Sequence, residues 1–249
     1  MHIASPFGIP LRIHWSYSLL VGGLMAWGFV KGGAPALGAS AFLAVALSVS
    51  VVLHELGHAL AARRFGIGTD NITLYPMGGV ASLERMPEEP DQELVIALAG
   101  PAVNIALAAI GGWGWMLTDH RLALGFVLMN LFLGLSNLLP AFPMDGGRVL
   151  RALLAKRMGW LPASRLAVRV GRVFAWGFIV VGVWWGDFSL PLMGAFLHLA
   201  LNSERERLVA MHWQQTTGRP PPWVGAAAWS LDPGKPFGLR PPQWLPPVR

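Results

Sequence analysis

The sequence predicts an all-α polytopic membrane protein, with six transmembrane helices and a small membrane-associated β element between helices two and three. Three observations lead to this fold class. Only 13% of the 249 residues are charged, against about 25% in a typical soluble domain, and 54% are hydrophobic. The apolar residues gather in long stretches, and the basic residues between these stretches are unevenly distributed.

The apolar stretches define the predicted helices. About 20 consecutive apolar residues form a helix long enough to cross the hydrocarbon core of a bilayer. Six stretches of this kind occur, of which the last two are the shortest. They cover approximately residues 11–30, 37–62, 94–117, 122–139, 173–185 and 190–201.

The region between the second and third stretches lacks a helical pattern. In residues 70–83, β-branched and aromatic side chains lie on both sides of a break at Pro76, Gly78 and Gly79. Such a pattern predicts short strands or a hairpin. We therefore expect the β element here.

The basic residues predict the orientation of the helices. With a cytoplasmic N-terminus, the outer loops fall near residues 31–36, 118–121 and 186–189, and they contain only Lys31 and Arg121 of the 19 basic residues. Cytoplasmic loops of membrane proteins are enriched in Lys and Arg. We therefore expect both termini in the cytoplasm, and we assign the net charge of +6 to cytoplasmic loops and not to nucleic-acid binding.

A metal-binding pattern lies at the inner end of the second stretch. His54 and His58 are four residues apart, so a helix places both imidazoles on one face, with Glu55 beside them as a general base. His54 follows Leu37 by 17 residues, or about 25 Å at 1.5 Å per residue. This depth predicts a site near the cytoplasmic boundary of the membrane.

A third metal ligand must be an acid or a histidine, because the chain contains no cysteine. Asp145 is the candidate, since the fourth stretch ends at the same membrane level as the second. Pro140 and Pro143 prevent a regular helix there, and an unwound segment can direct Asp145 inward. The alternative is a simple turn, in which Asp145 caps a helix that begins near Arg148.

These motifs resemble those of the site-2 protease family of intramembrane zinc metalloproteases, in the short form without appended regulatory domains. The resemblance covers roughly residues 8–202. It rests on four sequence elements: His54-Glu-Leu-Gly-His58, Asn137-x-x-Pro-x-x-Pro-x-Asp145-Gly, Gly100-Pro-Ala-Val-Asn104, and the glycine-containing loop Tyr75-Pro-Met-Gly-Gly-Val80.

The resemblance implies a role for each motif residue. One zinc ion per chain would be held by His54, His58 and Asp145, with Glu55 as the general base. Asn137 would bind the scissile carbonyl or its developing oxyanion. The remaining expected roles are a similar contribution from Asn104, for which a hydrogen bond between packed helices is the alternative, and pairing of an extended substrate with an edge strand near Gly78 and Gly79.

The expected function is that of an intramembrane zinc endopeptidase acting on single-span membrane proteins. Such substrates include anti-sigma factors and signal-peptide remnants, and the resemblance implies a prokaryotic inner membrane. We expect a transmembrane protease domain over residues 1–202, then a cytoplasmic helix and a Pro/Trp-rich tail over residues 203–249. The sequence leaves the oligomeric state open. The alternative is a catalytically idle metal-binding scaffold or transporter, against which the intact Glu55 argues.

Overall fold

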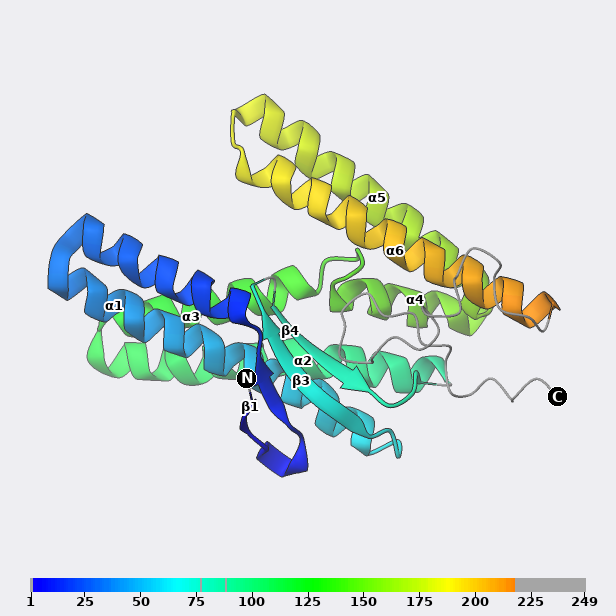
Figure 1. Ribbon diagram of the computed structural model, residues 1–249, viewed down its shortest axis with the longest axis horizontal. Coiled ribbons are helices and arrows are strands. Elements are labelled where there is room, and N and C mark those ends of the chain that lie inside the picture. Colours follow the sequence, from blue (N-terminus) through cyan, green and yellow to red (C-terminus); the bar gives the residue numbers. More distant parts are fainter. Residues whose placement is uncertain (1, 77, 88, 218–249) are drawn as a thin grey trace. The chain divides into compact units, whose positions relative to one another are not determined.

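The computed structural model describes residues 2–76, 78–87 and 89–217 (Figure 1). The tail from residue 218 onward, which contains most of the predicted Pro/Trp-rich segment, lies outside the described residues. The chain divides into two compact units. The first combines Met1–Glu84 with Ala99–Ser136, and the second combines Arg85–Leu98 with Asn137–Arg249.

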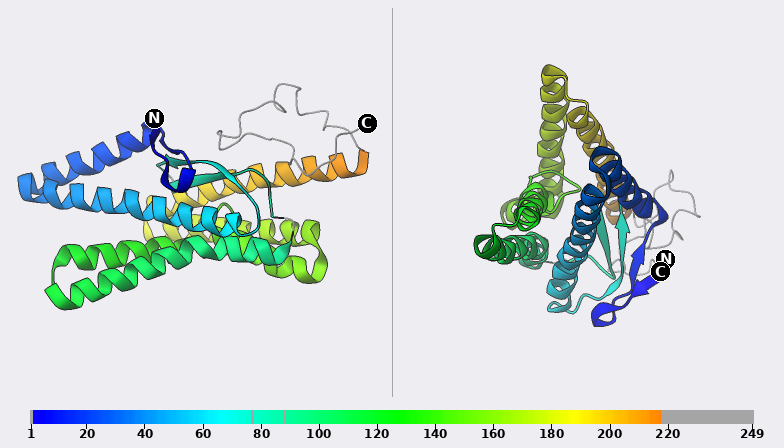
Figure 2. Two further views of the ribbon diagram at one scale, coloured as in Figure 1. Left: turned by 90° about the horizontal axis from the view of Figure 1, so that it is seen from below. Right: turned by 90° about the vertical axis from the view of Figure 1, so that its left-hand side faces the viewer.

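The first unit contains α1 (Trp15–Arg63), most of α2 (Pro90–Thr118) and α3 (Arg121–Asn137). Helix α1 is interrupted at Gly32 and Gly33, and Gly33 has a φ of 64° that glycine adopts readily. The interruption divides α1 into two legs that fold back on each other (Figures 1 and 2). These legs correspond to the first two predicted apolar stretches.

The two legs of α1 are in direct contact. A Cβ atom added at Gly28 of the first leg would lie 1.9 Å from the Ser40 Oγ of the second. Farther along, the Tyr17 hydroxyl and the Ser48 hydroxyl are 2.8 Å apart and share a hydrogen bond. A glycine therefore permits the close approach, and a polar pair fixes it.

A four-stranded sheet completes the first unit. Its order is β1 (His2–Ala4), β2 (Leu11–Ile13), β3 (Thr69–Tyr75) and β4 (Gly78–Leu83). The β1–β2 and β3–β4 pairs are antiparallel, and the β2–β3 pair is parallel. The β3–β4 hairpin confirms the β element predicted between the second and third apolar stretches.

The start predicted for the first helix, at Leu11, is wrong. Leu11–Ile13 form strand β2, which pairs with Ile72–Leu74 of β3. The helix begins after His14, whose side chain accepts a hydrogen bond from the backbone N–H of Ser16. An apolar residue such as Leu11 fits either structure, and here its burial against the sheet and α1 favours the strand.

The sheet packs on the second leg of α1. Ile72 and Leu74 of β3 are almost fully buried, and they belong to clusters that include Leu56 and Val51 of this leg. Burial of one such side chain contributes about 1.5–3 kcal/mol. The sheet therefore holds the part of α1 that carries the predicted metal ligands.

The second unit contains α4 (Asp145–Met158), α5 (Trp160–Trp185) and α6 (Ser189–Thr217). Helices α5 and α6 run side by side in opposite directions (Figures 1 and 2). Their connection turns at Gly186, which is left-handed, and the Asp187 carboxylate accepts hydrogen bonds from the first backbone N–H groups of α6. The core of this unit consists of Phe142, Ala167, Val168, Ala175, Leu197, Leu201 and Leu208.

The cytoplasmic helix predicted after residue 202 is instead continuous with the sixth apolar stretch, since both belong to α6 (Ser189–Thr217). Within this helix the Ser203 hydroxyl donates to the carbonyl of Leu199. The predicted boundary at residue 202 therefore falls inside α6. Helix α5 likewise begins before the predicted residue 173, at Trp160.

Three of the described helices are long and apolar enough to cross a membrane, namely α1, α2 and α5. Helix α3 is apolar but shorter. Each of the six predicted apolar stretches overlaps one of the described helices or one leg of α1. Membrane insertion of all six stays a prediction.

A buried ion-pair network links distant segments of the second unit. The Arg151 guanidinium of α4 donates to the carboxylates of Glu93 and Glu204, and both partners are nearly buried. Its guanidinium carbon also lies 5.0 Å from the ring centroid of Phe142 and 5.0 Å from that of Trp160. Arg151 thus connects four parts of the second unit: the first turn of α2, the segment that precedes α4, the start of α5, and α6.

We predict that Arg151→Met destabilises the protein by about 3–5 kcal/mol, because two buried carboxylates lose their cationic partner. The matched control is Lys156→Met on the same helix, which removes a pair to Asp91 whose side chains are 41% and 75% exposed. The control should cost less than about 1 kcal/mol. Thermal unfolding in detergent measures the stability of both variants. An equal loss of stability in the two would contradict the larger contribution that we assign to the Arg151 network.

Candidate metal centre

Two imidazole nitrogens converge on one face of α1. The Nε2 atoms of His54 and His58 are 3.0 Å apart, and the two rings are nearly perpendicular. Both side chains are buried in the second leg of α1. The four-residue spacing thus places the histidines on one face, as the sequence predicts.

The first histidine is oriented by an amide on a neighbouring helix. The Nδ1 atom of His54 lies 2.5 Å from the Oδ1 atom of Asn104 in α2. An amide oxygen only accepts hydrogen bonds, so Nδ1 donates and the Nε2 lone pair remains available to a metal. The amide nitrogen of Asn104 donates to Oδ1 of Asn130 in α3 over 3.0 Å.

Gly100 of α2 leaves space beside the two imidazoles. A Cβ atom there would lie 2.3 Å from Nε2 of His58 and 2.6 Å from Nε2 of His54. Any larger residue would therefore occupy the position where both ring nitrogens point. Gly57 permits the same close crossing from α1, because a Cβ atom there would meet the backbone oxygen of Ala99 at 2.9 Å.

Glu55 is held by the sheet. Its Oε2 atom accepts a hydrogen bond of 3.0 Å from the backbone N–H of Ala81 in β4. Its side chain also lies against Gly79, where a Cβ atom would be 2.4 Å from the Glu55 Cγ. The carboxylate is therefore next to the metal-binding face but is positioned by a different element.

Asp145 belongs to the second unit and is the first residue of α4. The helix that the turn alternative places near Arg148 therefore begins earlier, at Asp145 itself. Glycines follow it because the chain folds back tightly: a Cβ atom on Gly146 would lie 2.2 Å from the backbone oxygen of Leu138, and one on Gly147 would lie 2.7 Å from the backbone nitrogen of Phe142. The Asp-Gly-Gly sequence thus fixes the start of α4 against the segment before it.

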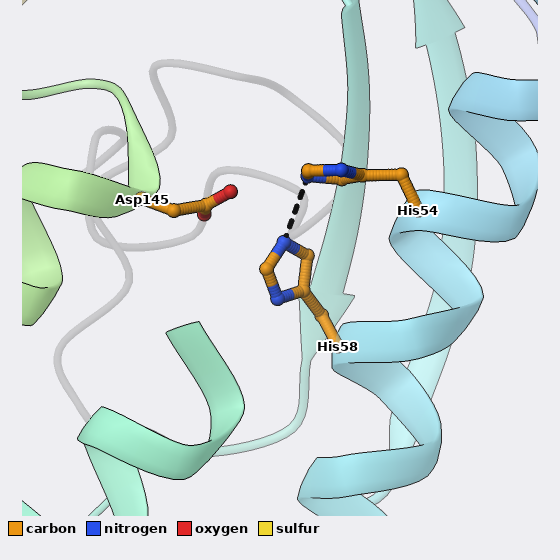
Figure 3. A group of neighbouring side chains, drawn as sticks. All are labelled: His54, His58 and Asp145. Atoms are coloured by element: carbon orange, nitrogen blue, oxygen red, sulfur yellow. Dashed lines mark hydrogen bonds between the residues drawn. The ribbon is translucent and has the colours of Figure 1, made fainter. Parts of the chain in front are cut away.

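The side chains of His54, His58 and Asp145 form a group that fits a zinc ion. Each offers one ligand atom, all of these atoms lie within 4.8 Å of one another, and all three residues are buried (Figure 3). Two imidazole nitrogens and one carboxylate oxygen are a donor set of catalytic zinc sites, which keep a further position open. The space at Gly100 agrees with a bound ion.

The remaining predicted site residues lie on other elements. Asn137 is half-buried at the end of α3, eight residues before Asp145. Gly78 and Gly79 begin β4, which pairs with no strand besides β3 among the described residues. Sequence reasoning missed Asn130, although a fully buried polar residue within an apolar helix is a signal of an interior role.

The family model of peptidase family M50 matches residues 42–120 and 118–178 of the chain. A zinc metalloprotease of Methanocaldococcus jannaschii is 35% identical over 205 residues, which are 79% of this chain and 58% of the relative. The Mycobacterium tuberculosis protein Rip3 is 36% identical over 233 residues, or 81% of this chain and 57% of the relative. The chain therefore spans less than two thirds of the length of these relatives.

A solved structure has the same fold. It is the site-2 protease from Methanocaldococcus jannaschii, with a TM-score of 0.63 and 32% sequence identity. The match covers 82% of this chain and 94% of that chain.

We predict that Gly100→Ala lowers zinc binding, because the added methyl group occupies the space beside both imidazoles. Gly112→Ala is the control on the same helix, since nothing lies within 4 Å of a Cβ atom there. Metal analysis of the purified proteins should find zinc reduced at least about tenfold only in Gly100→Ala. A full zinc content in Gly100→Ala would show that the metal does not bind in the space beside the two imidazoles.

Proposed function

Because the chain belongs to peptidase family M50, we propose that it is an intramembrane zinc endopeptidase that cleaves single-span membrane proteins in or near their transmembrane segments. The observation that carries this proposal is the arrangement of Glu55 beside His54 and His58. A structural metal site needs ligands only, whereas this one has a carboxylate at the adjacent position, held by a separate backbone hydrogen bond from Ala81. That arrangement suits proton transfer next to a metal.

We assign the metal-binding role to His54, His58 and Asp145. Zinc bound there would supply Lewis acidity at the scissile carbonyl and a nucleophile at neutral pH. Glu55 would take the proton from the attacking water and deliver it to the leaving amine. The Ala81 N–H would hold the Glu55 carboxylate in place by its hydrogen bond to Oε2.

The two asparagines receive different roles. Asn137 is proposed to donate its amide N–H to the oxygen that becomes negative during the reaction. Asn104 is proposed to act through His54 and not on the substrate, because both of its amide atoms already have buried partners in His54 and Asn130. Of the two readings that the sequence leaves open, the interhelical hydrogen bond therefore describes Asn104 better.

The edge of β4 that faces away from β3 is the proposed docking position for an extended substrate. The Ala81 N–H points to Glu55 and away from β3. Because alternate residues of a strand direct their backbone groups to the same side, Gly79 also directs its N–H and C=O to this edge. A substrate strand that pairs there would lie beside Glu55, and the absence of side chains at Gly78 and Gly79 would let it approach.

The substrate class and the location follow from the same assignment. A substrate helix must unwind before its peptide bonds can pair with β4, which suits single-span proteins such as anti-sigma factors or signal-peptide remnants. The distribution of the basic residues favours cytoplasmic termini and an active site near the cytoplasmic face. The family resemblance favours a prokaryotic inner membrane. Residues 1–202 are proposed as the protease domain, and residues 203–249 as a cytoplasmic extension.

We predict that Glu55→Gln retains zinc but lowers cleavage at least about 100-fold, because the amide cannot take up the proton. The substrate is a single-span protein reconstituted with the enzyme, and the readouts are cleavage rate and zinc content. Glu206→Gln, at an exposed position of α6, is the control and should cleave normally. Normal cleavage by Glu55→Gln would instead favour the idle metal-binding scaffold.

A photo-crosslinking phenylalanine analogue tests the edge of β4. At position 80, where Val80 is 39% exposed, it should capture a single-span substrate in the Glu55→Gln background. The matched control is position 181 on α5, where Val181 is 40% exposed. Electrophoresis should detect the covalent product mainly from position 80. Equal capture at both positions would argue against docking on β4.

A further inference from the structure

We propose that Asn130 is a positioning residue of the metal centre, which determines through Asn104 which ring nitrogen of His54 carries the lone pair that binds zinc. The inference rests on the proposed zinc site but not on the proposed proteolysis. Asn130 lies on α3, within the fourth predicted apolar stretch, and its amide is hydrogen-bonded to Asn104 and to the backbone of Phe126.

The observation is a chain of three hydrogen bonds across three helices. The Asn130 Nδ2 donates to the backbone carbonyl of Phe126 over 3.0 Å, and the Asn130 Oδ1 accepts from the Asn104 Nδ2 over 3.0 Å. The Asn104 Oδ1 then lies 2.5 Å from the His54 Nδ1. Asn104 and Asn130 are both fully buried, so water cannot replace any of these partners.

The backbone carbonyl of Phe126, at the end farthest from the metal centre, determines which atom donates and which accepts in each of these hydrogen bonds. An asparagine amide can be turned by 180° with little change of shape, so its orientation depends on its partners. A backbone carbonyl can only accept, and the carbonyl of Phe126 therefore requires the nitrogen of Asn130. The oxygen of Asn130 must then face Asn104, and it in turn requires the nitrogen of Asn104.

This series of hydrogen bonds ends at His54 and selects one tautomer of its ring. Since the nitrogen of Asn104 is held by Asn130, its oxygen faces His54 and requires the hydrogen on Nδ1. Nε2 then carries the lone pair that a metal needs. If the amide of Asn104 were turned, its nitrogen would face Nδ1, and the hydrogen of the neutral ring would occupy Nε2 instead.

A purely structural role would be different. Hydrogen bonds between buried polar side chains join membrane helices, and each contributes about 0.6–1.7 kcal/mol. In that role the loss of Asn130 would lower the stability of the protein without changing its zinc affinity. The loss of another buried asparagine with a similar contribution to stability would then have the same effect. The positioning role predicts a loss of zinc affinity beyond the loss of stability, so the two can be separated by measuring both.

The test uses zinc alone, in competition with a chelator, on the purified full chain. Asn130→Leu should weaken zinc binding about 10–100-fold, as removal of outer-shell partners of metal ligands commonly does. Asn71→Leu is the matched control, because Asn71 is a buried asparagine of β3 whose oxygen accepts from Thr73. Thermal unfolding of the zinc-free proteins reports the structural cost of each substitution.

A double substitution provides the rescue. In Asn104→Asp/Asn130→Leu, either carboxylate oxygen accepts from the Nδ1 of His54, so no orientation has to be set and zinc affinity should return to within about tenfold of the wild type. Asn130→Asp also keeps an acceptor toward Asn104 and should avoid the loss, which provides a second comparison if Asn130→Leu does not fold. Unchanged zinc affinity in Asn130→Leu, or an equal loss in the double variant, would overturn the proposal.

Discussion

The first unit depends on one constraint: a polar group buried among apolar helices needs a hydrogen-bond partner, because water is excluded there. His54 satisfies it with Asn104, and Asn104 satisfies it with Asn130. The amides therefore do more than join helices, since each restricts the orientation of the next. Two ordinary side chains and one backbone carbonyl are enough to prepare a ring nitrogen for a metal.

Space is the complementary requirement, and glycine supplies it. At Gly100 and Gly57 the absence of a side chain brings α1 and α2 together where the imidazoles lie, and at Gly79 it brings β4 against Glu55. The second unit uses glycine in the same way beside Asp145, where Gly146 lies against the preceding backbone. In both units the polar group that we assign to the chemistry lies beside a close backbone approach, so the packing of the backbone limits its position.

The metal ligands could be predicted from the sequence, but the strand and the amide that hold them in position could not. His54 and His58 were predictable because four-residue spacing on a helix is local information. Strand β2 was missed because Leu11 is equally compatible with a helix, and its partner Ile72 is far away in the chain. Asn130 was missed for the same reason: a buried amide in an apolar helix signals an interior role, but only the tertiary packing of α2 against α3 identifies Asn104 as its partner.

The second unit stabilises its functional segment with charge, whereas the first uses neutral amides. Arg151 is buried with two carboxylates, and its guanidinium also covers the ring of Phe142, three residues before Asp145. A buried ion pair is favourable only when its geometry is good and its hydrogen bonds are complete, and removal of one member is costly. Such a network therefore resists small displacements of the segment before α4. It suits a residue like Asp145, whose function as a ligand would tolerate little movement.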